Sequence, residues 1–306
     1  MDNKPKIAVL LASFNGEAFI QEQIETILNQ SKVNLKIYIS DDGSDDNTIN
    51  VIQQLKHNNC IEIIETNLKG GSAAYNFFNL IKTLILDDFE YVAFADQDDI
   101  WLNNKLVNGI STMTENNAEG YSSNFTVLKG NRNLGKVNKG VRQTKYDFLF
   151  SSPGPGCTFI ITRKSYSQLR IELIKNSIAF YGCRYHDWAI YAYYRSKSLK
   201  WVIDENSYIL YRQHSNNDTG ANKGIKAFSK RIKLIQKQWY NHEINKIFSL
   251  STCYNHDLKE EFSNISPLRF SYLLLKYSRR KISERIFVFW LYLFKLLNRK
   301  SFIQKL

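Results

Sequence analysis

The sequence predicts an α/β protein with a mostly parallel sheet and flanking helices, followed by a C-terminal helical extension rich in basic and aromatic residues. Short apolar segments alternate with amphipathic ones up to about residue 119, which is typical of βαβ units. The chain of 306 residues is 43% hydrophobic and 14% aromatic, enough for a large core. Residues 226–306 contain 17 Lys and Arg against 5 Asp and Glu, so the net charge of +12 belongs entirely to this extension.

The first hundred residues alternate between two hydrophobic patterns. Continuous apolar runs that end in small or polar residues indicate strands buried on both faces. Between them, apolar residues recur at helical spacing, as Ile20, Ile24, Ile27 and Leu28 do. The expected strands are 6–13, 35–42, 61–66 and 91–95, and the expected helices are 16–31, 46–58, 72–85 and one that starts near residue 104.

The pattern is weaker beyond residue 119. There we expect a Gly/Pro-containing loop that leads into a strand, a helix that starts at the sequence YHDW, and further strands. The expected elements are a strand at 119–128, the loop and strand within 148–162, the helix 185–196, and strands at 200–204 and 208–214. We therefore divide the chain into a domain 1–225, with halves of about 1–100 and 101–225, and an extension 226–306.

Polar residues follow each of the first four expected strands. In a parallel α/β sheet, the carboxyl ends of the strands meet at one edge, where ligands bind. The convergence of these residues is stronger evidence for a site than any one of them. The segments are Ser13 to Asn15, Asp41 to Ser44, Asn67 to Gly71, and Asp96 to Asp99.

The fourth segment contains the D-x-D pair Asp96 and Asp98. Two carboxylates two residues apart on a turn can face one cation, and such oxygen ligands suit Mg²⁺ or Mn²⁺. A divalent ion there would neutralise a leaving nucleotide diphosphate. The alternative is that Asp99 caps the next helix and the other carboxylates are solvated.

Two further segments have both a binding and a structural interpretation. A carboxylate of the pair Asp41–Asp42 can accept hydrogen bonds from a base or ribose, and Gly43 permits close approach. A turn with Ser44 or Asp45 as a helix cap explains the same residues. The pair Gly70–Gly71 at a helix entry can hold an anion. It lacks the dinucleotide-binding and P-loop spacings, and a simple turn is the alternative.

The second half offers a candidate base and a candidate metal ligand. Asp187, flanked by His186 and Trp188, can act as a general base on an acceptor hydroxyl, or it caps the helix that it starts. His214 can ligate a metal through neutral imidazole, and Arg212 can contact phosphate. A surface histidine is the alternative for His214.

Taken in order, six segments resemble the family 2 inverting glycosyltransferases with the GT-A fold. They span residues 6–217, about two thirds of the chain. The form ADQDDIW together with HDW and YRQH is similar to the bacterial rhamnosyltransferase-like branch, which builds capsules and other surface polysaccharides. The segments are IAVLLASFNGEAFIQEQIETILNQ, ISDDGSDDNT, NLKGGSAAYNFFNLI, YVAFADQDDIW, YHDW and YRQHSNN.

The resemblance implies roles on the donor side of the site. Asp42 would contact the nucleotide base, in a pocket lined by Ala12 and Phe14. Many relatives carry Arg-Asn where this chain has Tyr75-Asn76. The base contact at Asn76 is therefore open, and with it the choice between uridine and thymidine.

The resemblance also assigns the metal and the chemistry. Asp98 would bind Mn²⁺ or Mg²⁺ directly, Asp96 would lie near the ribose or a metal-bound water, and His214 would be a third metal contact. Asp187 would match the catalytic base of the family.

The acceptor side is implied by the loop SSPGPGC and the segment HDW. Gly156 and Cys157 of the loop, together with His186 and Trp188, would shape it. The implied reaction is a single displacement with inversion. A sugar moves from dTDP-rhamnose or a UDP-hexose to a saccharide acceptor, which we expect to be lipid-linked.

Three other functions are alternatives to glycosyl transfer. A nucleotidyltransferase that makes nucleotide sugars would carry a Gly-rich, Arg-containing loop where this chain has SFNGEAF. A nucleic-acid-binding protein would spread its basic charge over its binding face, whereas this chain combines an acidic strand edge with a basic tail; we expect no nucleic-acid partner. A catalytically inactive relative that only binds sugar is left open.

The composition of the extension predicts where in the cell the protein is located. Its apolar run 286–294 is too short to span a bilayer, but Lys and Arg flank it. Tyr272, Tyr277, Trp290 and Tyr292 are suited to a headgroup layer. We expect a peripheral contact with the inner leaflet of the cell membrane; a helical subdomain packed on the core, or a homodimer contact, is the alternative. Four separated cysteines fit a reducing cytoplasm.

Overall fold

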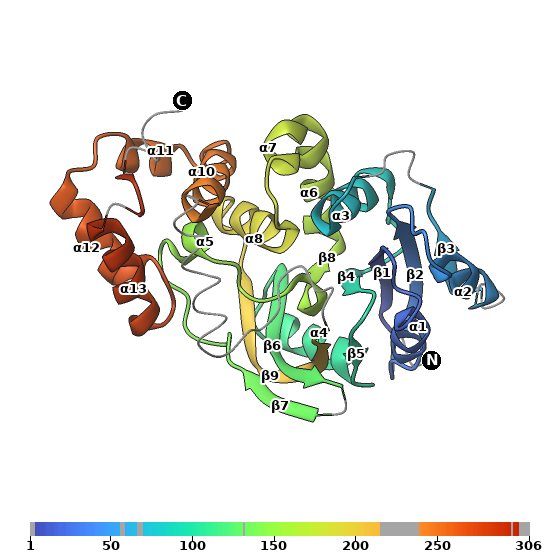
Figure 1. The fold of residues 1–306 in the computed structure, drawn as a ribbon. Coiled ribbons are helices and arrows are strands. Elements are labelled where there is room, and N and C mark those ends of the chain that lie inside the picture. The colour runs from blue at the N-terminus through green and yellow to red at the C-terminus, as the bar shows by residue number, and fades with distance from the viewer. Residues whose placement is uncertain are drawn as a thin grey trace.

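Figure 1 shows the computed structural model, which describes residues 4–55, 59–65, 70–130, 132–214, 239–294 and 296–299. A single sheet runs through the middle, and helices pack against it. The last four labelled helices gather at the end of the molecule opposite strand β3. The expected boundary between domain and extension, at residues 225–226, lies outside the described residues.

The N-terminal half contains the parallel part of the sheet. Strand order is β3-β2-β1-β4, and all three pairings are parallel, as the alternating pattern predicts. The register places Ala12 opposite Ser40 on one side and Asp96 on the other. The elements are β1 (Lys6–Ser13), α1 (Ile20–Leu28), β2 (Asn34–Asp41), α2 (Thr48–Leu55), β3 (Ile61–Ile63), α3 (Ala73–Thr83) and β4 (Tyr91–Asp96).

The sheet becomes mixed beyond β4. Strand β8 pairs antiparallel with β4 and β6, and β6 pairs parallel with β9. At the edges, β5 pairs antiparallel with β9, and β7 pairs antiparallel with β6. The sheet is therefore wholly parallel over the first four strands, as expected, and mixed beyond them. These strands are β5 (Ile100–Trp101), β6 (Gly120–Lys129), β7 (Arg132–Val137), β8 (Ile160–Thr162) and β9 (Trp201–Arg212).

Two expectations in this half need correction. The two strands expected at 200–204 and 208–214 are one continuous strand, β9. Its register against β6 shifts twice between Ser123 and Thr126, so the irregularity is a bulge and not a break. Strand β7 and helices α6 and α7 were not expected. The helices of this half are α4 (Lys105–Glu115), α5 (Asp147–Phe150), α6 (Arg163–Lys175), α7 (Ser177–Tyr181) and α8 (His186–Ser196).

The described part of the extension, within 239–299, is helical, as the composition of the extension predicts. Helix α10 packs against α8 and α5 of the preceding domain. Among the described residues, no helix combines the length and the apolar character needed to cross a bilayer. The helices are α10 (Trp239–Thr252), α11 (His256–Ser263), α12 (Pro267–Tyr277) and α13 (Ile282–Leu293).

The core has one layer on each face of the sheet, because successive strand residues point to opposite faces. On one face Leu10 and Phe94 pack with residues of α3, α6 and α8. On the other face Val9 and Ala95 pack with residues of α1 and α4. Both faces are covered, which explains why the first strands are apolar without interruption. The strand ends remain the place where polar groups reach the surface.

Candidate active site

Gln97, the middle residue of the D-x-D pair, ties the loops after β1 and β4 together. The Phe14 N–H donates to Gln97 Oε1 at 2.8 Å, and Gln97 Nε2 donates to the Phe14 carbonyl at 2.8 Å. A Cβ on Gly16 would overlap the Gln97 amide, so a larger residue here would displace that amide from its paired contacts. The paired contacts leave the Phe14 side chain 51% exposed at the strand edge. The sequence analysis missed Gln97, because it treated the residue as a spacer.

The turn after β2 directs Asp41 and Asp42 in different directions. Asp41 folds the turn, since its Oδ1 accepts from the N–H groups of Gly43 (3.0 Å) and Ser44 (2.7 Å). Gly43 has a φ of +85°, a conformation that glycine adopts readily. The Asp42 carboxylate accepts from the Gly70 N–H at 2.5 Å. Asp42 and Gly70, predicted separately, therefore lie side by side at the strand ends.

Asn76 lies beneath this edge and is 3% exposed. Its Nδ2 donates to the Ser40 carbonyl at 2.9 Å and to the Ser13 carbonyl at 3.4 Å, so it fastens the ends of β1 and β2. Its Oδ1 is buried without a hydrogen-bond partner. The structure thus places Asn76 as a support for the strand ends near Ala12.

The structure brings Asp98 and His214 together. His214 Nε2 lies 2.7 Å from Asp98 Oδ2, and the imidazole stacks on Phe19 with ring centroids 4.9 Å apart. Burial raises the pKa of Asp98, and its hydrogen bond with His214 opposes that shift. Two ligands of one Mn²⁺ or Mg²⁺ lie about 3 Å apart when they occupy neighbouring positions. The spacing of these two side chains fits a shared cation.

Arg212, at the end of β9, fixes the carboxylate turn from the other side. Its backbone N–H donates to Asp99 Oδ1 at 3.1 Å and its Nε to the Asp98 carbonyl at 3.0 Å. Its Nη2 pairs with Glu22 at 2.5 Å. The predicted phosphate-binding arginine is therefore also a structural clamp on the turn.

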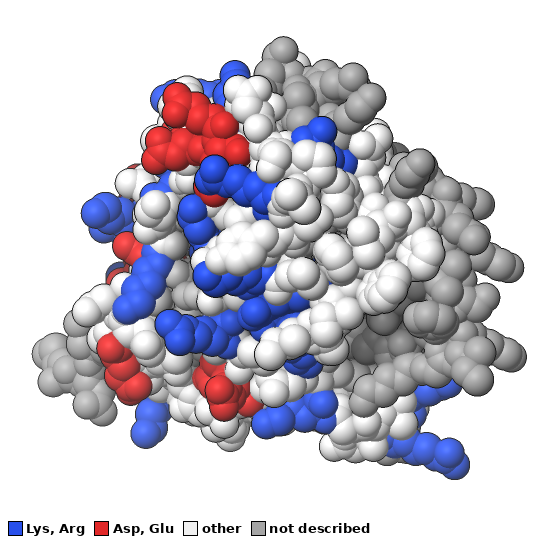
Figure 2. Space-filling model, turned by 90° about the vertical axis from the view of Figure 1, so that its left-hand side faces the viewer, with Lys and Arg blue, Asp and Glu red and all other residues white. Residues whose placement is uncertain are grey.

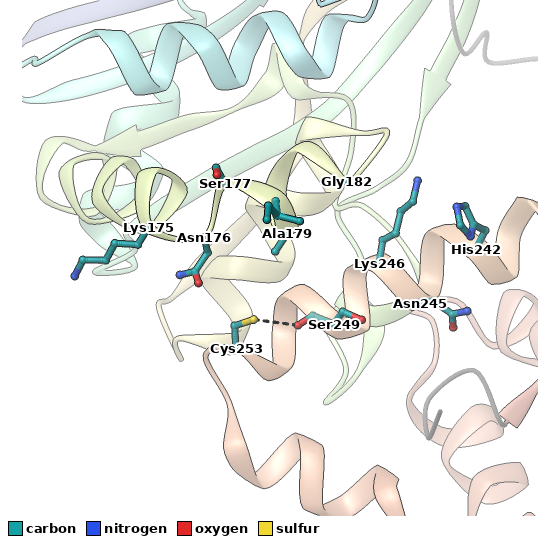
Figure 3. Close-up of a pocket in the computed structure, with 11 residues that line it drawn as sticks. Lys175, Asn176, Ser177, Ala179, Gly182, His242, Asn245, Lys246, Ser249 and Cys253 are labelled. Atoms are coloured by element: carbon teal, nitrogen blue, oxygen red, sulfur yellow. Dashed lines mark hydrogen bonds between the residues drawn. The ribbon is translucent and has the colours of Figure 1, made fainter. Parts of the chain in front are cut away.

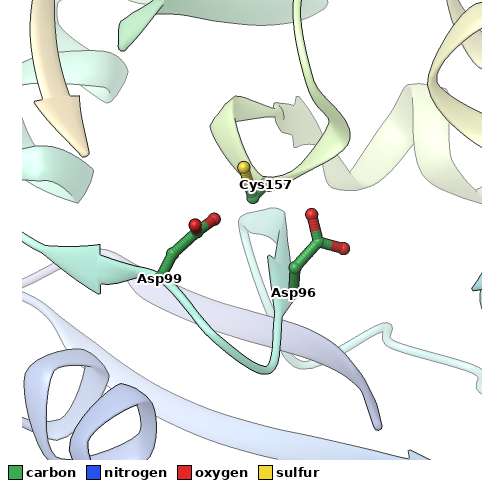
Figure 4. A group of neighbouring side chains, drawn as sticks. All are labelled: Asp96, Asp99 and Cys157. Carbon is green, nitrogen blue, oxygen red and sulfur yellow. The ribbon is translucent and has the colours of Figure 1, made fainter. Parts of the chain in front are cut away.

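Asp99 is 1% exposed and does not cap a helix, because α4 starts after Asn104. The alternative that made Asp99 a cap is therefore wrong. Figure 4 shows Asp96, Asp99 and the thiol of Cys157 together, with their ligand atoms all within 4.8 Å of one another. Burial, followed by the charges of Asp98 and Asp96, raises the pKa of Asp99 well above its usual range.

Lys105 lies behind this group as a buried cation. Its Nζ sits 3.5 Å from the centre of the Trp101 ring, and burial lowers its pKa to about 7. Carboxylates this close repel one another and stay ionised only where positive charge is near. Carboxylate oxygens are the ligands that suit Mn²⁺ and Mg²⁺. The turn thus fits a hard divalent cation on the side of Asp98 and His214.

Asp187 is held at the start of α8, whose cap is Tyr185 and not Asp187. Its Oδ2 accepts from the Ser152 hydroxyl at 2.9 Å, and its Oδ1 from the Trp188 N–H at 2.7 Å. Burial raises the pKa of Asp187 to about 6, with the Ser152 hydrogen bond as the largest opposing contribution. A carboxylate that titrates just below neutral pH is suited to accept a proton.

His186 packs more tightly than the sequence indicates. It stacks on Phe77 with ring centroids 4.1 Å apart, and burial lowers its pKa to about 3, so the ring is neutral. Its Nε2 is buried without a partner and adjoins Gly156, where a Cβ would overlap it. Glycine at 156 is therefore required by the ring of His186.

The other two residues expected on the acceptor side are core residues. Trp188 is 5% exposed, and its Nε1 donates to the Phe148 carbonyl at 2.7 Å. Cys157 has no exposed surface and faces Asp96 and Asp99. Both support the site from below in this structure.

A separate pocket of about 540 Å³ opens between α6, α7 and α10 (Figure 3). None of the predicted site residues lines it. Its lining residues are Lys175, Asn176, Ser177, Ile178, Ala179, Gly182, His242, Asn245, Lys246, Ser249 and Cys253.

Solved structures share this fold. A mannosyltransferase from Pyrobaculum calidifontis, solved with GDP-Man and Mn²⁺, matches with a TM-score of 0.56 at 12% identity, over 97% of this chain and 73% of that chain. S. aureus TarS 1-349 in complex with UDP-GlcNAc matches with a TM-score of 0.53 at 14% identity, over 97% and 84%. The fold is the GT-A fold that the resemblance predicts.

The sequence comparisons define the family. The family model "Glycosyl transferase family 2" matches residues 8–183, more than half of the chain. The dTDP-rhamnosyl transferase RfbG of Shigella flexneri is 37% identical over 285 residues, which cover 91% of this chain and 97% of that protein. An Escherichia coli β-1,3-glucosyltransferase, WfgD, which acts from UDP-Glc on α-D-GlcNAc-diphosphoundecaprenol, is 28% identical over 51% of this chain and 59% of its own.

The chain therefore belongs to glycosyl transferase family 2, and it is a glycosyltransferase. The resemblance to the rhamnosyltransferase-like branch is confirmed by the similarity to RfbG.

Proposed function

We propose that this glycosyltransferase moves rhamnose from dTDP-rhamnose to a saccharide on a diphosphate-linked polyprenyl lipid, with inversion, during synthesis of a surface polysaccharide. One observation carries the proposal. Consecutive residues connect the two parts of the site: Cys157 adjoins Asp96 and Asp99, and Gly156 adjoins His186, the neighbour of Asp187. This supports a site in which the proposed cation-binding turn and the proposed base would lie on either side of one short segment.

The donor would lie along the strand ends. Phe14 and Ala12 would line the base pocket, Asp42 would accept from the base, and Asp96 would approach the ribose. Asp98 and His214 would hold Mn²⁺ or Mg²⁺, which when bound supplies positive charge to the departing diphosphate. Mn²⁺ in the mannosyltransferase complex is consistent with this choice of metal.

Asp187 would then accept the proton of the acceptor hydroxyl as that oxygen attacks the anomeric carbon. Its raised pKa makes it a stronger base than a solvated aspartate while leaving it mostly ionised at neutral pH. Attack from the side of Asp187 and departure of the diphosphate toward Asp98 give inversion by a single displacement. His186, neutral and fixed against Phe77, would border the sugar.

The choice of donor follows the most extensive of the reported sequence matches. RfbG is named for dTDP-rhamnose and aligns along almost its whole length. A UDP-hexose is the second candidate, favoured by the glucosyltransferase WfgD, whose printed acceptor also supports a lipid diphosphate here. The rival functions of nucleotidyltransferase and nucleic-acid-binding protein lose their basis with the family assignment.

The extension would place the enzyme at the inner leaflet. Leu268 (85% exposed), Ile282 (70%), Trp290 (49%) and Phe294 (67%) are apolar residues at the surface of α12, α13 and their ends. Figure 2 shows this side of the molecule, where Lys and Arg side chains lie among uncharged ones and clusters of Asp and Glu lie toward the top and the bottom of the view. Exposed apolar side chains with cations nearby suit an anionic lipid surface.

Two of the four aromatic residues expected at the headgroup layer support this surface and two do not. Tyr272 (53% exposed) and Trp290 lie at the surface. Tyr277 and Tyr292 pack partly buried against the main hydrophobic cluster, so the extension is also a subdomain packed on the core. Homodimer formation stays a prediction.

Donor competition tests the proposed function. The purified chain should show a larger thermal shift with dTDP plus Mn²⁺ than with either alone. It should release dTDP from dTDP-rhamnose faster than UDP from UDP-glucose. Faster release of UDP would replace the donor assignment, and no shift with any nucleoside diphosphate and Mn²⁺ would overturn the site.

A further inference from the structure

Two hydrogen bonds in series connect Asp187 to the C-terminal extension. The Ser152 hydroxyl lies 2.9 Å from Asp187 Oδ2. Arg280 Nη2 donates to the carbonyl oxygen of the same serine at 2.8 Å. Arg280 lies between α12 and α13, far along the chain from Asp187, and it is 8% exposed.

A buried carboxylate fixes the guanidinium of Arg280. Asp147 has no exposed surface, and its Oδ2 accepts from Arg280 Nη1 at 3.1 Å and from the Tyr191 hydroxyl at 2.8 Å. Its Oδ1 accepts from Arg195 Nη1 at 2.8 Å. A buried ion pair with several hydrogen bonds holds its members in one geometry. The extension is thus locked onto the catalytic domain beside the loop that carries Ser152.

The position of this loop determines which acceptor receives the Ser152 hydroxyl proton, because the hydroxyl has only one proton to donate. The hydroxyl lies close to the Gly154 carbonyl as well as to Asp187, and the Gly154 N–H donates to the hydroxyl oxygen at 3.1 Å. The proton can therefore go to either acceptor. Arg280 grips the Ser152 carbonyl and so sets the orientation of the loop.

We propose that Arg280 and Ser152 are positioning residues for Asp187, and that the extension thereby completes the active site as well as serving as an anchor. The inference rests on the proposed role of Asp187 as the base. It deepens that role, because it assigns the control of the base to a contact with the α12–α13 connection.

The charged groups around Asp187 determine how its pKa should respond to substitution. Besides Ser152 and the Trp188 N–H, Lys139 acts on the carboxylate. Burial, Arg280 and Arg279 lower the pKa of Lys139 to about 8, and Glu284 and Asp187 oppose that shift. The lysine is thus mainly cationic near pH 6. Loss of the Ser152 hydroxyl removes the largest contribution that holds the pKa of Asp187 down.

The direct test is a carboxyl ¹³C NMR titration of the full-length chain, with the Asp187 signal assigned by its loss in Asp187→Asn. Ser152→Ala should raise the pKa of Asp187 by about one unit. Ser152→Thr, which keeps a hydroxyl, should restore it. Arg280→Lys should raise it by less, because a lysine cannot bridge Ser152 and Asp147 together.

Arg269→Lys is the matched control, since Arg269 lies in the same extension with its side chain 62% exposed and pairs only loosely with Glu261, at 3.5 Å. It should leave the Asp187 pKa unchanged. An unchanged pKa in Ser152→Ala would overturn the proposal. Ser152→Ala leaves the Asp147 contacts intact, so it decides the role of the serine even where Arg280→Lys does not fold.

A kinetic arm separates this inference from the proposed function. The acid limb of kcat/KM for dTDP release from dTDP-rhamnose, with water as acceptor and Mn²⁺ present, should move upward with the NMR pKa in Ser152→Ala. A loss of folded protein would lower the rate without moving the limb. If Asp187→Asn keeps its turnover, the base assignment fails; if Asp187→Asn is inactive but Ser152→Ala moves neither value, only the positioning role fails.

Discussion

Asp98 and Asp187, the two carboxylates that we propose as metal ligand and base, have different environments. Asp98 faces His214 at 2.7 Å, and it lies near Asp99, whose pKa is raised by burial and by the charges of Asp98 and Asp96. The Asp187 carboxylate accepts from one serine hydroxyl and one backbone N–H, and the charge of Lys139 also acts on it. Crowded carboxylates suit a cation, and an isolated, partly desolvated one suits proton transfer. Environment, and not residue type, assigns the two roles.

The largest expected effect comes from the isolated carboxylate. Asp187→Asn should lower transfer by about 10²- to 10⁴-fold, the range that a general base contributes. The affinity for dTDP with Mn²⁺ should not change, because Asp187 lies away from the nucleotide pocket. Single-turnover kinetics and calorimetry measure the two quantities, and near-normal transfer would assign the base elsewhere.

The crowded carboxylate should respond to metal concentration. Asp98→Asn and His214→Ala should each raise the Mn²⁺ concentration for half-maximal activity by at least about tenfold, and the double variant should do little worse, because the two residues share one ion. A Mn²⁺ titration of turnover measures this. His242→Ala, an exposed histidine beside the remote pocket, is the control; an equal response there would remove the specific role of His214.

The pH dependence distinguishes the two groups further. Burial raises the folded-state pKa of Asp187 to about 6 from 3.8. The rate should therefore rise as pH passes through about 6, because the base must be ionised. The free energy of unfolding should fall as the pH rises from about 4 to about 6. In this range Asp187 is already ionised in the unfolded chain, which therefore binds fewer protons than the folded chain. A rate that is flat from pH 5 to 8 would contradict the assignment.

The loop that contains Gly156 should not tolerate a larger residue at that position. Gly156→Ala places a Cβ on the buried His186 ring and should cost about 1–3 kcal/mol in the free energy of unfolding. Gly154→Ala is a matched control in the same loop, because its Cβ would meet nothing nearer than the Ser123 carbonyl at 3.5 Å. Urea denaturation of both variants compares them, and equal stability would mean that the ring moves aside.

The smallest expected effect is at the surface of the extension. Lys281→Glu should weaken binding to vesicles that contain anionic lipid by severalfold, since one cation near such a surface is worth about 1 kcal/mol. Trp290→Ser should weaken it through lost apolar contact. Ile178→Ser, at a side chain 90% exposed on α7, should not. Co-sedimentation measures all three, and salt-insensitive binding would favour a protein contact instead.

The convergence of polar residues at the strand ends was largely predictable from sequence, because parallel strands must bring their ends together. Asp42, Phe14 and Asp98 follow strands that are recognisable from their apolar runs. His214 was predicted as a metal contact from the family motif, and the structure places it against Asp98.

The roles of the remaining residues depend on contacts between distant parts of the chain, which the local sequence pattern does not indicate. Gln97 looked like a spacer between two aspartates, and Ser152 was one polar residue in a Gly/Pro loop. Arg280 was one of many cations in a basic tail, and only its burial against Asp147 sets it apart. Cys157 and Trp188 were expected on the acceptor side because their motifs lie there, but their side chains turn into the core.

Anomalous diffraction from crystals soaked with Mn²⁺ and dTDP tests the central claim most directly. The account predicts one strong manganese peak within about 2.5 Å of Asp98 Oδ2 and His214 Nε2, with the diphosphate on the ion and the thymine against Phe14. A peak elsewhere, or bound nucleotide with no metal at this pair of residues, would contradict the account.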